Sequence, residues 1–253
     1  MGLHPFRHTN PGVGGEKKIQ TPDRKLPVSE IFLSIQGEGV HAGTPSVFLR
    51  TYFCNLSCTW CDTKYTWLNQ AESKEGVDYK SLEAREVVRQ ISGFHCGHLV
   101  VTGGEPLLHQ EALLPILSDL KQNGFFIEVE TNGTMAPEPG LTALVDCFNV
   151  SPKTSNSKVE QRLRVREASL SALLRSRKAW FKFVISEPAD IKEVEELVGE
   201  LELPQDRVIL MPEGTDAEAV LSRGAWLAGA CEEKGYRFSP RLQILLFGNR
   251  RGT

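Results

Sequence analysis

Three cysteines that lie close together in the sequence are the residues best suited to bind a metal. Cys54, Cys58 and Cys61 are spaced C-x3-C-x2-C and follow a predicted strand. A structural zinc site needs a fourth ligand, and because the next cysteine lies 35 residues further on, His95 and His98 are the remaining candidates. Three cysteines can instead hold a four-iron cluster in which one iron stays open to a non-protein ligand. The spacing favours this reactive cluster over zinc.

The elements that must position these cysteines form an alternating pattern. Short β-rich runs bounded by turn residues predict strands over residues 28–35, 46–53, 99–102, 125–130, 147–150, 180–185, 207–211 and 242–247. Apolar residues at helical spacing predict helices over residues 81–91, 111–122, 191–201 and 217–233. Strands that alternate with helices form right-handed βαβ units, so we expect an α/β fold with a parallel sheet.

Polar, turn-forming segments follow four of the predicted strands. They are Thr102–Glu105, Glu130–Gly133, Ser151–Lys153 and Met211–Gly214. In parallel α/β sheets, ligands bind at the carboxyl ends of the strands, because short loops converge there while the strands hold them rigidly. The sequence therefore predicts a single site at this edge of the sheet.

Two segments differ from the rest of the chain. Residues 1–26 are rich in Gly, Pro, Lys, His and Thr, so we expect a flexible N-terminal arm followed by one domain over residues 27–253. Residues 154–178 have a local excess of Lys and Arg. Because runs of charge are usually solvated, we interpret this stretch as a helical insertion with an exposed basic face rather than as an RNA or partner patch.

Composition excludes several classes of protein. The formal net charge of -3 gives no general basic field, so we expect no stable binding of nucleic acid through its phosphates. The apolar runs are much shorter than the roughly 20 residues of a membrane-spanning helix. Residues 1–25 also lack the apolar core of a signal peptide. We therefore expect a protein of the reducing cytoplasm, in which the six cysteines do not form disulfides.

A second motif accompanies the cysteines. Trp60 precedes the last cysteine, and Gly103–Pro106 reads Gly-Gly-Glu-Pro after a later strand. Together the two motifs resemble those of the radical S-adenosylmethionine (SAM) superfamily. The resemblance implies a [4Fe-4S] cluster and SAM as cofactors. Glycines without Cβ would let the backbone approach the methionyl group, Glu105 would pair with its ammonium, and Glu130 would accept hydrogen bonds from the ribose.

Further motifs narrow the resemblance to one family. They are Ser34–Gly39, Phe48–Arg50, Cys61–Thr63, Glu130–Thr134, Ser151–Lys153 and Ser239–Asn249. This set resembles the 7-carboxy-7-deazaguanine synthases, which convert 6-carboxy-5,6,7,8-tetrahydropterin into 7-carboxy-7-deazaguanine and ammonia on the route to queuosine-type tRNA bases. The resemblance implies a partial (β/α)6 barrel with N-terminal additions as the single catalytic domain. It also implies Mg2+, a flavodoxin-type or ferredoxin-type electron donor and a homodimer.

The resemblance assigns individual residues as well. The cluster ligands are Cys54, Cys58 and Cys61, and the Mg2+ ligand is Thr63. The substrate-binding residues are Ile35, Gln36, Gly37, Glu38, Arg50 and Thr102. The cofactor-binding residues are Trp60, Cys61, Asp62, Gly104, Glu105, Glu130, Ser151, Pro152, Lys153, Met211, Pro212, Glu213 and Gly214. Amide and carboxylate groups suit the polar edge of a pterin, and the planar fork of Arg50 suits a carboxylate.

Two other functions stay open at this point. A radical SAM activase that acts on a partner protein shares the cysteine triplet and the glycine motif, but it needs a docking surface for that protein. A zinc module without enzymatic activity needs a complete set of zinc ligands. The loop at residues 36–39 together with Arg50 favours a compact polar ligand over both alternatives.

Overall fold

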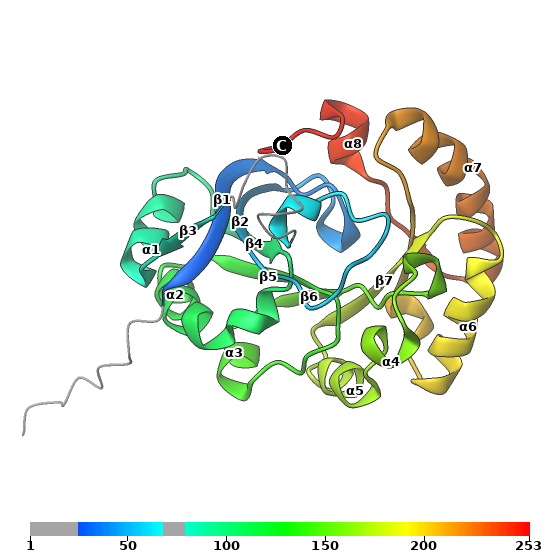
Figure 1. Cartoon of the computed structure of the whole chain (residues 1–253), viewed down its shortest axis with the longest axis horizontal. Coiled ribbons are helices and arrows are strands. Elements are labelled where there is room, and N and C mark those ends of the chain that lie inside the picture. The colour runs from blue at the N-terminus through cyan, green and yellow to red at the C-terminus, as the bar shows by residue number, and fades with distance from the viewer. Residues whose placement is uncertain (1–24, 68–78) are drawn as a thin grey trace, which may run out of the picture.

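One curved sheet organises the described part of the chain (Figure 1). The computed structural model describes residues 25–67 and 79–253. Within these ranges the sheet has nine strands in the order β3-β1-β2-β4-β5-β6-β7-β8-β9. The strands are β1 (Leu26–Ile35), β2 (Pro45–Thr51), β3 (Lys80–Leu82), β4 (His98–Gly103), β5 (Phe126–Thr131), β6 (Cys147–Val150), β7 (Ala179–Ile185), β8 (Val208–Pro212) and β9 (Arg237–Phe238).

Helices surround the outside of this curved sheet (Figure 1). They are α1 (Ala84–Ser92), α2 (Gln110–Gln122), α3 (Pro139–Leu144), α4 (Gln161–Arg164), α5 (Glu167–Arg175), α6 (Asp190–Glu200) and α7 (Ala217–Lys234). The last helix, α8 (Leu242–Phe247), instead contacts the loop after β1. None of the helices in the described ranges is both long enough and apolar enough to cross a bilayer.

The strand directions confirm the predicted partial barrel. β2 and β4 to β9 run parallel to one another, whereas β1 pairs antiparallel with β2, and β3 pairs antiparallel with β1. The two antiparallel strands are the expected N-terminal addition. Since Ile35 lies opposite Pro45, the first residue of β2, the loop after β1 starts at the amino-terminal edge of the parallel strands.

Residues on the parallel strands alternate between two environments. In β7, Phe181 and Phe183 belong to the apolar core between the sheet and the helices, whereas Lys182 lies on the opposite face. In β5, Ile127 and Val129 likewise face the apolar core, and Glu128 lies between them. The hydrophobic core therefore lies outside the barrel, and polar side chains fill its interior, where chemistry requires them.

One predicted strand is a helix. The segment Leu242–Phe247 forms α8, because its burial does not alternate as in a strand: Ile244 is buried but Leu246 is 58% exposed. The short β9 already pairs with the free edge of β8. A mainly apolar segment of six residues is compatible with either a strand or a helix, so its periodicity could not distinguish them. The predicted helix over residues 81–91 also starts later than expected, at Ala84, after β3.

The basic segment at residues 154–178 is helical, as expected, but it is not an insertion. Its helices α4 and α5 connect β6 to β7, which is the place of the crossover helix in a βαβ unit. Arg162 and Arg175 on these helices are exposed, whereas Arg164 is buried and bonded to the backbone oxygen of Lys153 at 2.8 Å. The segment thus has one basic face exposed to solvent and one face whose buried arginine bonds the loop after β6.

The predicted arm over residues 1–26 lies outside the described residues except for its last two. Leu26 begins β1 and is fully buried in the core. The folded domain therefore includes Leu26.

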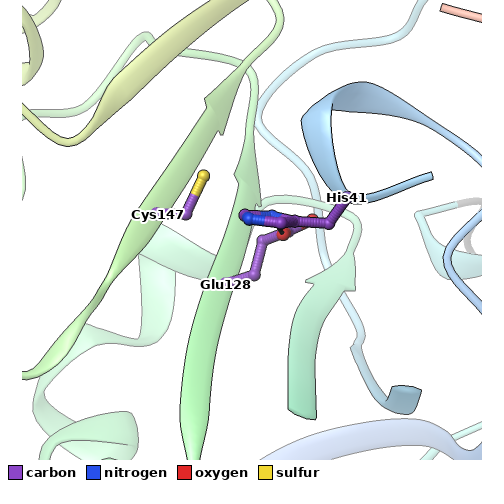
Figure 2. A group of neighbouring side chains, drawn as sticks. All are labelled: His41, Glu128 and Cys147. Carbon is purple, nitrogen blue, oxygen red and sulfur yellow. Dashed lines mark hydrogen bonds and ion pairs between the residues drawn. The ribbon is translucent and has the colours of Figure 1, made fainter. Parts of the chain in front are cut away.

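A polar cluster fastens the loop after β1 to the inner face of the sheet. His41 ends a short 3-10 turn, and its Nδ1 contacts the carboxylate of Glu128 on β5 (Figure 2). Donor atoms of His41, Glu128 and Cys147 all lie within 4.8 Å of one another. Glu128 is fully buried and also accepts a hydrogen bond from Gln36. The hydrogen bond to Glu128 raises the pKa of His41, although partial burial opposes this effect.

This contact predicts a pH dependence of stability. Because the pKa of His41 is raised on folding, its stabilising contribution is complete below its unfolded value and disappears as the pH rises through the folded value. Urea unfolding from about pH 6 to about pH 9 should show a loss of free energy of unfolding that is absent in His41→Gln. The exposed His95 provides the control, since His95→Gln should retain the loss. An identical pH profile in His41→Gln and the parent would contradict this role.

Candidate active site

The inner face of the sheet and the loops at its carboxyl edge enclose a cavity of about 440 Å³. Most of the predicted site residues line it: Ile35, Gln36, Gly37, Glu38, Arg50, Cys54, Cys58, Trp60, Cys61, Asp62, Thr63, Thr102, Gly104, Glu130, Ser151, Lys153, Met211 and Glu213. Four predicted residues do not line it: Glu105, Pro152, Pro212 and Gly214. The fold thus brings the cysteine loop and the predicted substrate residues together in one space.

The cysteine loop leaves β2 through an unusual backbone conformation. Phe53 has a φ of 77°, a left-handed value that bulky residues rarely adopt. Its backbone is held on both sides, since its N–H donates to the oxygen of Thr66 at 2.7 Å and its carbonyl accepts from the N–H of Glu105 at 2.8 Å. This turn directs Cys54 into the cavity, and the contact with Glu105 places the loop beside the end of β4.

The donor set of the cavity fits a cluster held by three cysteines. Among the described residues that line the cavity, Cys54, Cys58 and Cys61 are accompanied by no fourth cysteine and by no histidine. His98 instead bonds Ser46 at 2.6 Å near the amino end of the barrel. The predicted zinc alternative therefore lacks its ligands here. The three thiols suit an iron–sulfur cluster that leaves one iron open to SAM.

The surroundings of the thiols control their protonation. Burial raises the pKa of Cys54 to about 11 and also raises the pKa of Cys58. Without a metal both groups are thiols, so cluster assembly releases their protons. The indole N–H of Trp67 donates to the sulfur of Cys61 at 3.3 Å, and this kind of contact stabilises a thiolate.

The glycine motif packs against the cysteine loop. A Cβ on Gly104 would lie 2.0 Å from the carbonyl oxygen of Phe53, so only glycine allows this approach. Glu105 is fully buried, and its carboxylate accepts from Leu107 N at 2.9 Å, Thr131 Oγ1 at 2.8 Å and Asn132 N at 2.7 Å. In this structure Glu105 ties the end of β4 to the end of β5 and does not face the cavity, where contact with SAM was expected.

The loops after β6 and β8 contribute to the opposite side of the cavity. The Nζ atom of Lys153 donates to Ser151 Oγ at 2.8 Å and lies 5.3 Å from the ring centroid of Trp60. Met211 and Glu213 line the cavity from β8 and its following loop. The predicted cofactor segments therefore reach the cysteine loop from the far side of the barrel.

The loop after β1 crosses the interior of the barrel and meets the segment at α8. The N–H of Leu242 donates to the oxygen of Gly37 at 3.0 Å. A Cβ on Gly37 would lie 1.8 Å from Oε1 of Gln243 and 2.9 Å from its backbone nitrogen, which explains the glycine. Gln36 is 3% exposed and donates to Glu130 at 3.2 Å. The predicted substrate loop is thus a fixed inner wall of the cavity.

A chain of ion pairs, in which the cations are buried, links this wall to the strands. Lys182 Nζ lies 2.6 Å from Glu38 and 2.9 Å from Glu130, and it is only 2% exposed. Arg241 contacts Glu38 at 3.1 Å and also pairs with Asp62. Burial raises the pKa of Glu38, but the charges of Lys182 and Arg241 outweigh it and hold that pKa well below its usual range. Glu38 is therefore a permanent carboxylate.

The neighbouring charges act differently on the other carboxylate of this chain. Burial raises the pKa of Glu130, and the opposing effect of Lys182 is offset by the neighbouring carboxylates Glu128 and Glu38. Glu130 and Glu38 in turn raise the pKa of Lys182 against the effect of burial, so its ammonium stays charged.

Arg50 lies on the other wall, on β2. Its Nε donates to Glu30 at 2.6 Å, and the same carboxylate oxygen accepts from Tyr65 at 2.9 Å. The guanidinium carbon lies 5.7 Å from the ring centroid of Phe32. Arg50 thus has a structural partner in Glu30, and it also lines the cavity, where the resemblance places it.

Sequence reasoning missed several polar residues of the cavity, including three that contact Glu38. These three, Lys182, Arg241 and Gln243, all line the cavity. One signal was present, since Lys182 is a charged residue in the otherwise apolar strand β7. Arg241 and Gln243 belong to a motif that had been noted only as part of a resemblance. The amide of Gln243 donates to Glu38 at 2.7 Å, while its Oε1 is buried without a hydrogen-bond partner.

Comparison with known proteins agrees with this site. Residues 48–219 match the family model described as Radical SAM superfamily. The chain is 40% identical to the 7-carboxy-7-deazaguanine synthase of Pyrobaculum aerophilum, with 90% of this chain and 97% of that protein covered. It is 36% identical to the enzyme of the same name from Rhodopirellula baltica, with coverage of 94% and 95%.

A solved structure shows the same relationship. The crystal structure of QueE from Escherichia coli superposes with a TM-score of 0.66 and 28% sequence identity, and the match covers 85% of this chain and 93% of that one. The family match, the full-length relatives and the shared fold lead to one conclusion. The chain belongs to the radical SAM superfamily and, within it, to the family of the 7-carboxy-7-deazaguanine synthases.

Proposed function

We propose that this protein converts 6-carboxy-5,6,7,8-tetrahydropterin into 7-carboxy-7-deazaguanine and ammonia. The observation that carries the proposal is that the three cysteines and the substrate residues of the resemblance line one cavity. Its volume of about 440 Å³ lies within the roughly 300–1,000 Å³ of small-molecule sites. A cavity of this size, into which Gln36, Glu38 and Arg50 place polar groups, favours a compact heterocycle over the polypeptide that a radical activase would bind.

The cofactors of this family are a [4Fe-4S] cluster and SAM, which together supply a 5'-deoxyadenosyl radical when bound. Cys54, Cys58 and Cys61 would hold the cluster. The residues that would hold SAM are Trp60, Asp62, Gly104, Glu130, Ser151, Lys153, Met211 and Glu213. Glu105 supports this set indirectly, through the strand ends that it joins.

The substrate residues would bind the pterin through complementary polar groups. Glu38 offers a permanent negative charge to the N–H donors of the pterin ring, and Gln36 offers an amide that can both donate and accept. Arg50 presents a guanidinium fork to the substrate carboxylate, which gives a charge-assisted and geometrically specific contact. Thr102 adds a hydroxyl and Ile35 an apolar contact from the cavity wall.

Apolar side chains would protect the reaction from water. Phe48, Leu56 and Val184 line the cavity among the polar groups. A reactive radical abstracts hydrogen from any nearby group unless the site excludes water and holds the substrate close. These walls therefore serve confinement, while the polar groups serve orientation.

Other parts of the proposal extend to partners and location. A flavodoxin-type or ferredoxin-type donor would reduce the cluster, and two copies of the chain would form a homodimer in the cytoplasm. The six cysteines in the described residues are all free, which supports a reducing compartment.

Anaerobic turnover tests the function directly. Reduced, cluster-loaded protein with SAM, Mg2+ and the carboxytetrahydropterin should release 7-carboxy-7-deazaguanine and ammonia, detected by mass spectrometry. Cys58→Ala should give neither product nor SAM cleavage, because the cluster loses a ligand. Cys96→Ala, outside the cavity, should retain turnover. Absence of deazaguanine from preparations with a full complement of iron would reject the proposed function.

Arg50→Ala should separate substrate orientation from cofactor chemistry. We expect SAM cleavage to persist, while kcat/KM for the pterin falls about 10²-fold because the carboxylate loses its partner. Arg89→Ala, an exposed arginine on α1, serves as the control and should behave as the parent. If cleavage and turnover fall by the same factor, Arg50 is a structural partner of Glu30 only.

We also propose that Thr63 binds Mg2+ together with substrate oxygens and water. Its hydroxyl lies 3.7 Å from the sulfur of Cys61, at the mouth of the cluster loop. Thr63→Ala should raise the Mg2+ concentration for half-maximal turnover about 10-fold with an unchanged iron content, and Thr63→Ser should restore it. A Mg2+ titration that is the same in Thr63→Ala and the parent would remove this ligand.

A further inference from the structure

The guanidinium of Arg241 joins three segments that are far apart in the sequence. It pairs with Asp62 in the cysteine loop, lies 3.1 Å from Glu38 in the substrate loop and donates to the carbonyl oxygen of Gly214 after β8. Its side chain is 8% exposed. We propose that Arg241 is a positioning residue that sets where the substrate lies relative to SAM. This inference rests on the proposed function.

The chemistry of these contacts requires arginine. The three acceptors belong to different chain segments, and the guanidinium offers five N–H donors in a rigid plane. A lysine ammonium at the end of a flexible chain cannot reproduce that fork. Arg241 therefore fixes the relative positions of the three segments, whereas lysine would at best neutralise one carboxylate.

Glu38 is held from its other side as well. Lys182 binds its Oε2 at 2.6 Å, and Gln243 binds the same Oε1 that faces Arg241 at 2.7 Å. Both oxygens are therefore engaged, and the carboxylate cannot adopt another rotamer without breaking buried bonds. Removing Arg241 would leave Lys182 as its remaining cation and would free Asp62 from its partner.

The position of Asp62 extends the consequence to the cofactor. Asp62 lies between Cys61 and Thr63, and Gly214 follows Glu213, which lines the cavity. A shift of about 1 Å between bound reactants can lower a rate about 10²-fold. Loss of Arg241 should therefore uncouple the two halves of the reaction: SAM is cleaved, but hydrogen abstraction from the pterin becomes unproductive.

The test compares Arg241→Met and Arg241→Lys with the parent under anaerobic turnover. We expect kcat/KM for the pterin to fall about 10²-fold in Arg241→Met, with more 5'-deoxyadenosine released per deazaguanine formed. In Arg241→Lys both quantities should be intermediate between those of the parent and Arg241→Met, because lysine restores the positive charge but not the planar fork. The control is Arg207→Met, an arginine stacked on Trp180 at the amino end of β8, which should leave both quantities unchanged.

A second readout is independent of turnover. Pterin binding to the cluster-loaded protein, measured by calorimetry without SAM, should weaken about 10-fold or more in both Arg241 variants. If Arg241→Met fails to fold or to retain iron, Arg241→Lys decides the question by the same two measurements.

The outcomes separate this inference from the proposed function. A parent protein that forms no deazaguanine overturns the proposed function itself. A parent that turns over, with Arg241→Lys and any folded Arg241→Met showing parental kcat/KM, binding and product ratio, overturns the role of Arg241 alone.

Discussion

A chain of alternating charges, in which the two cations Lys182 and Arg241 are buried, constrains the interior of this barrel. Glu130, Lys182, Glu38, Arg241 and Asp62 follow one another from β5 to the cysteine loop. Removing a charge from water costs free energy unless the charge has a close partner of opposite sign. Removal of one member of a buried pair leaves the other member buried without compensation, which is strongly destabilising. Each member is therefore held by its neighbours. The ion pairs hold the loops that carry Glu38 and Asp62 in place relative to the strands, although these loops are not part of the sheet.

This constraint solves the geometric problem of a barrel that does not close. The carboxyl edge of the parallel strands positions the cysteine loop and the loops after β4 to β8. The loop after β1 instead starts at the amino-terminal edge and reaches the cavity from that side. Gly37 allows that loop to lie against the backbone of Gln243, and His41 fastens its far end to Glu128. The loop after β1 and the cysteine loop thus lie on either side of the cavity. The sheet alone would leave this side of the barrel open.

The sequence predicted the parts of the site that depend on short-range patterns. The cysteine spacing, the strand alternation and the glycine motif each involve only a few consecutive residues. It could not predict pairs such as Lys182 with Glu38, which lie 144 residues apart, or Arg241 with Glu38, which lie 203 apart. Glu105 was assigned to SAM because a motif states a residue type but not the direction of its side chain. The segment Leu242–Phe247 was misassigned because a short, mainly apolar segment fits either period.

The account depends on three thiols that hold a cluster with one iron left for SAM. Mössbauer spectroscopy of protein reconstituted with iron-57 measures the ligation of each iron separately. We predict four irons per cluster, of which one changes its isomer shift and quadrupole splitting when SAM is added, since the cavity supplies no fourth cysteine from its described lining. A spectrum in which all irons have thiolate ligation and remain unchanged by SAM would contradict the account.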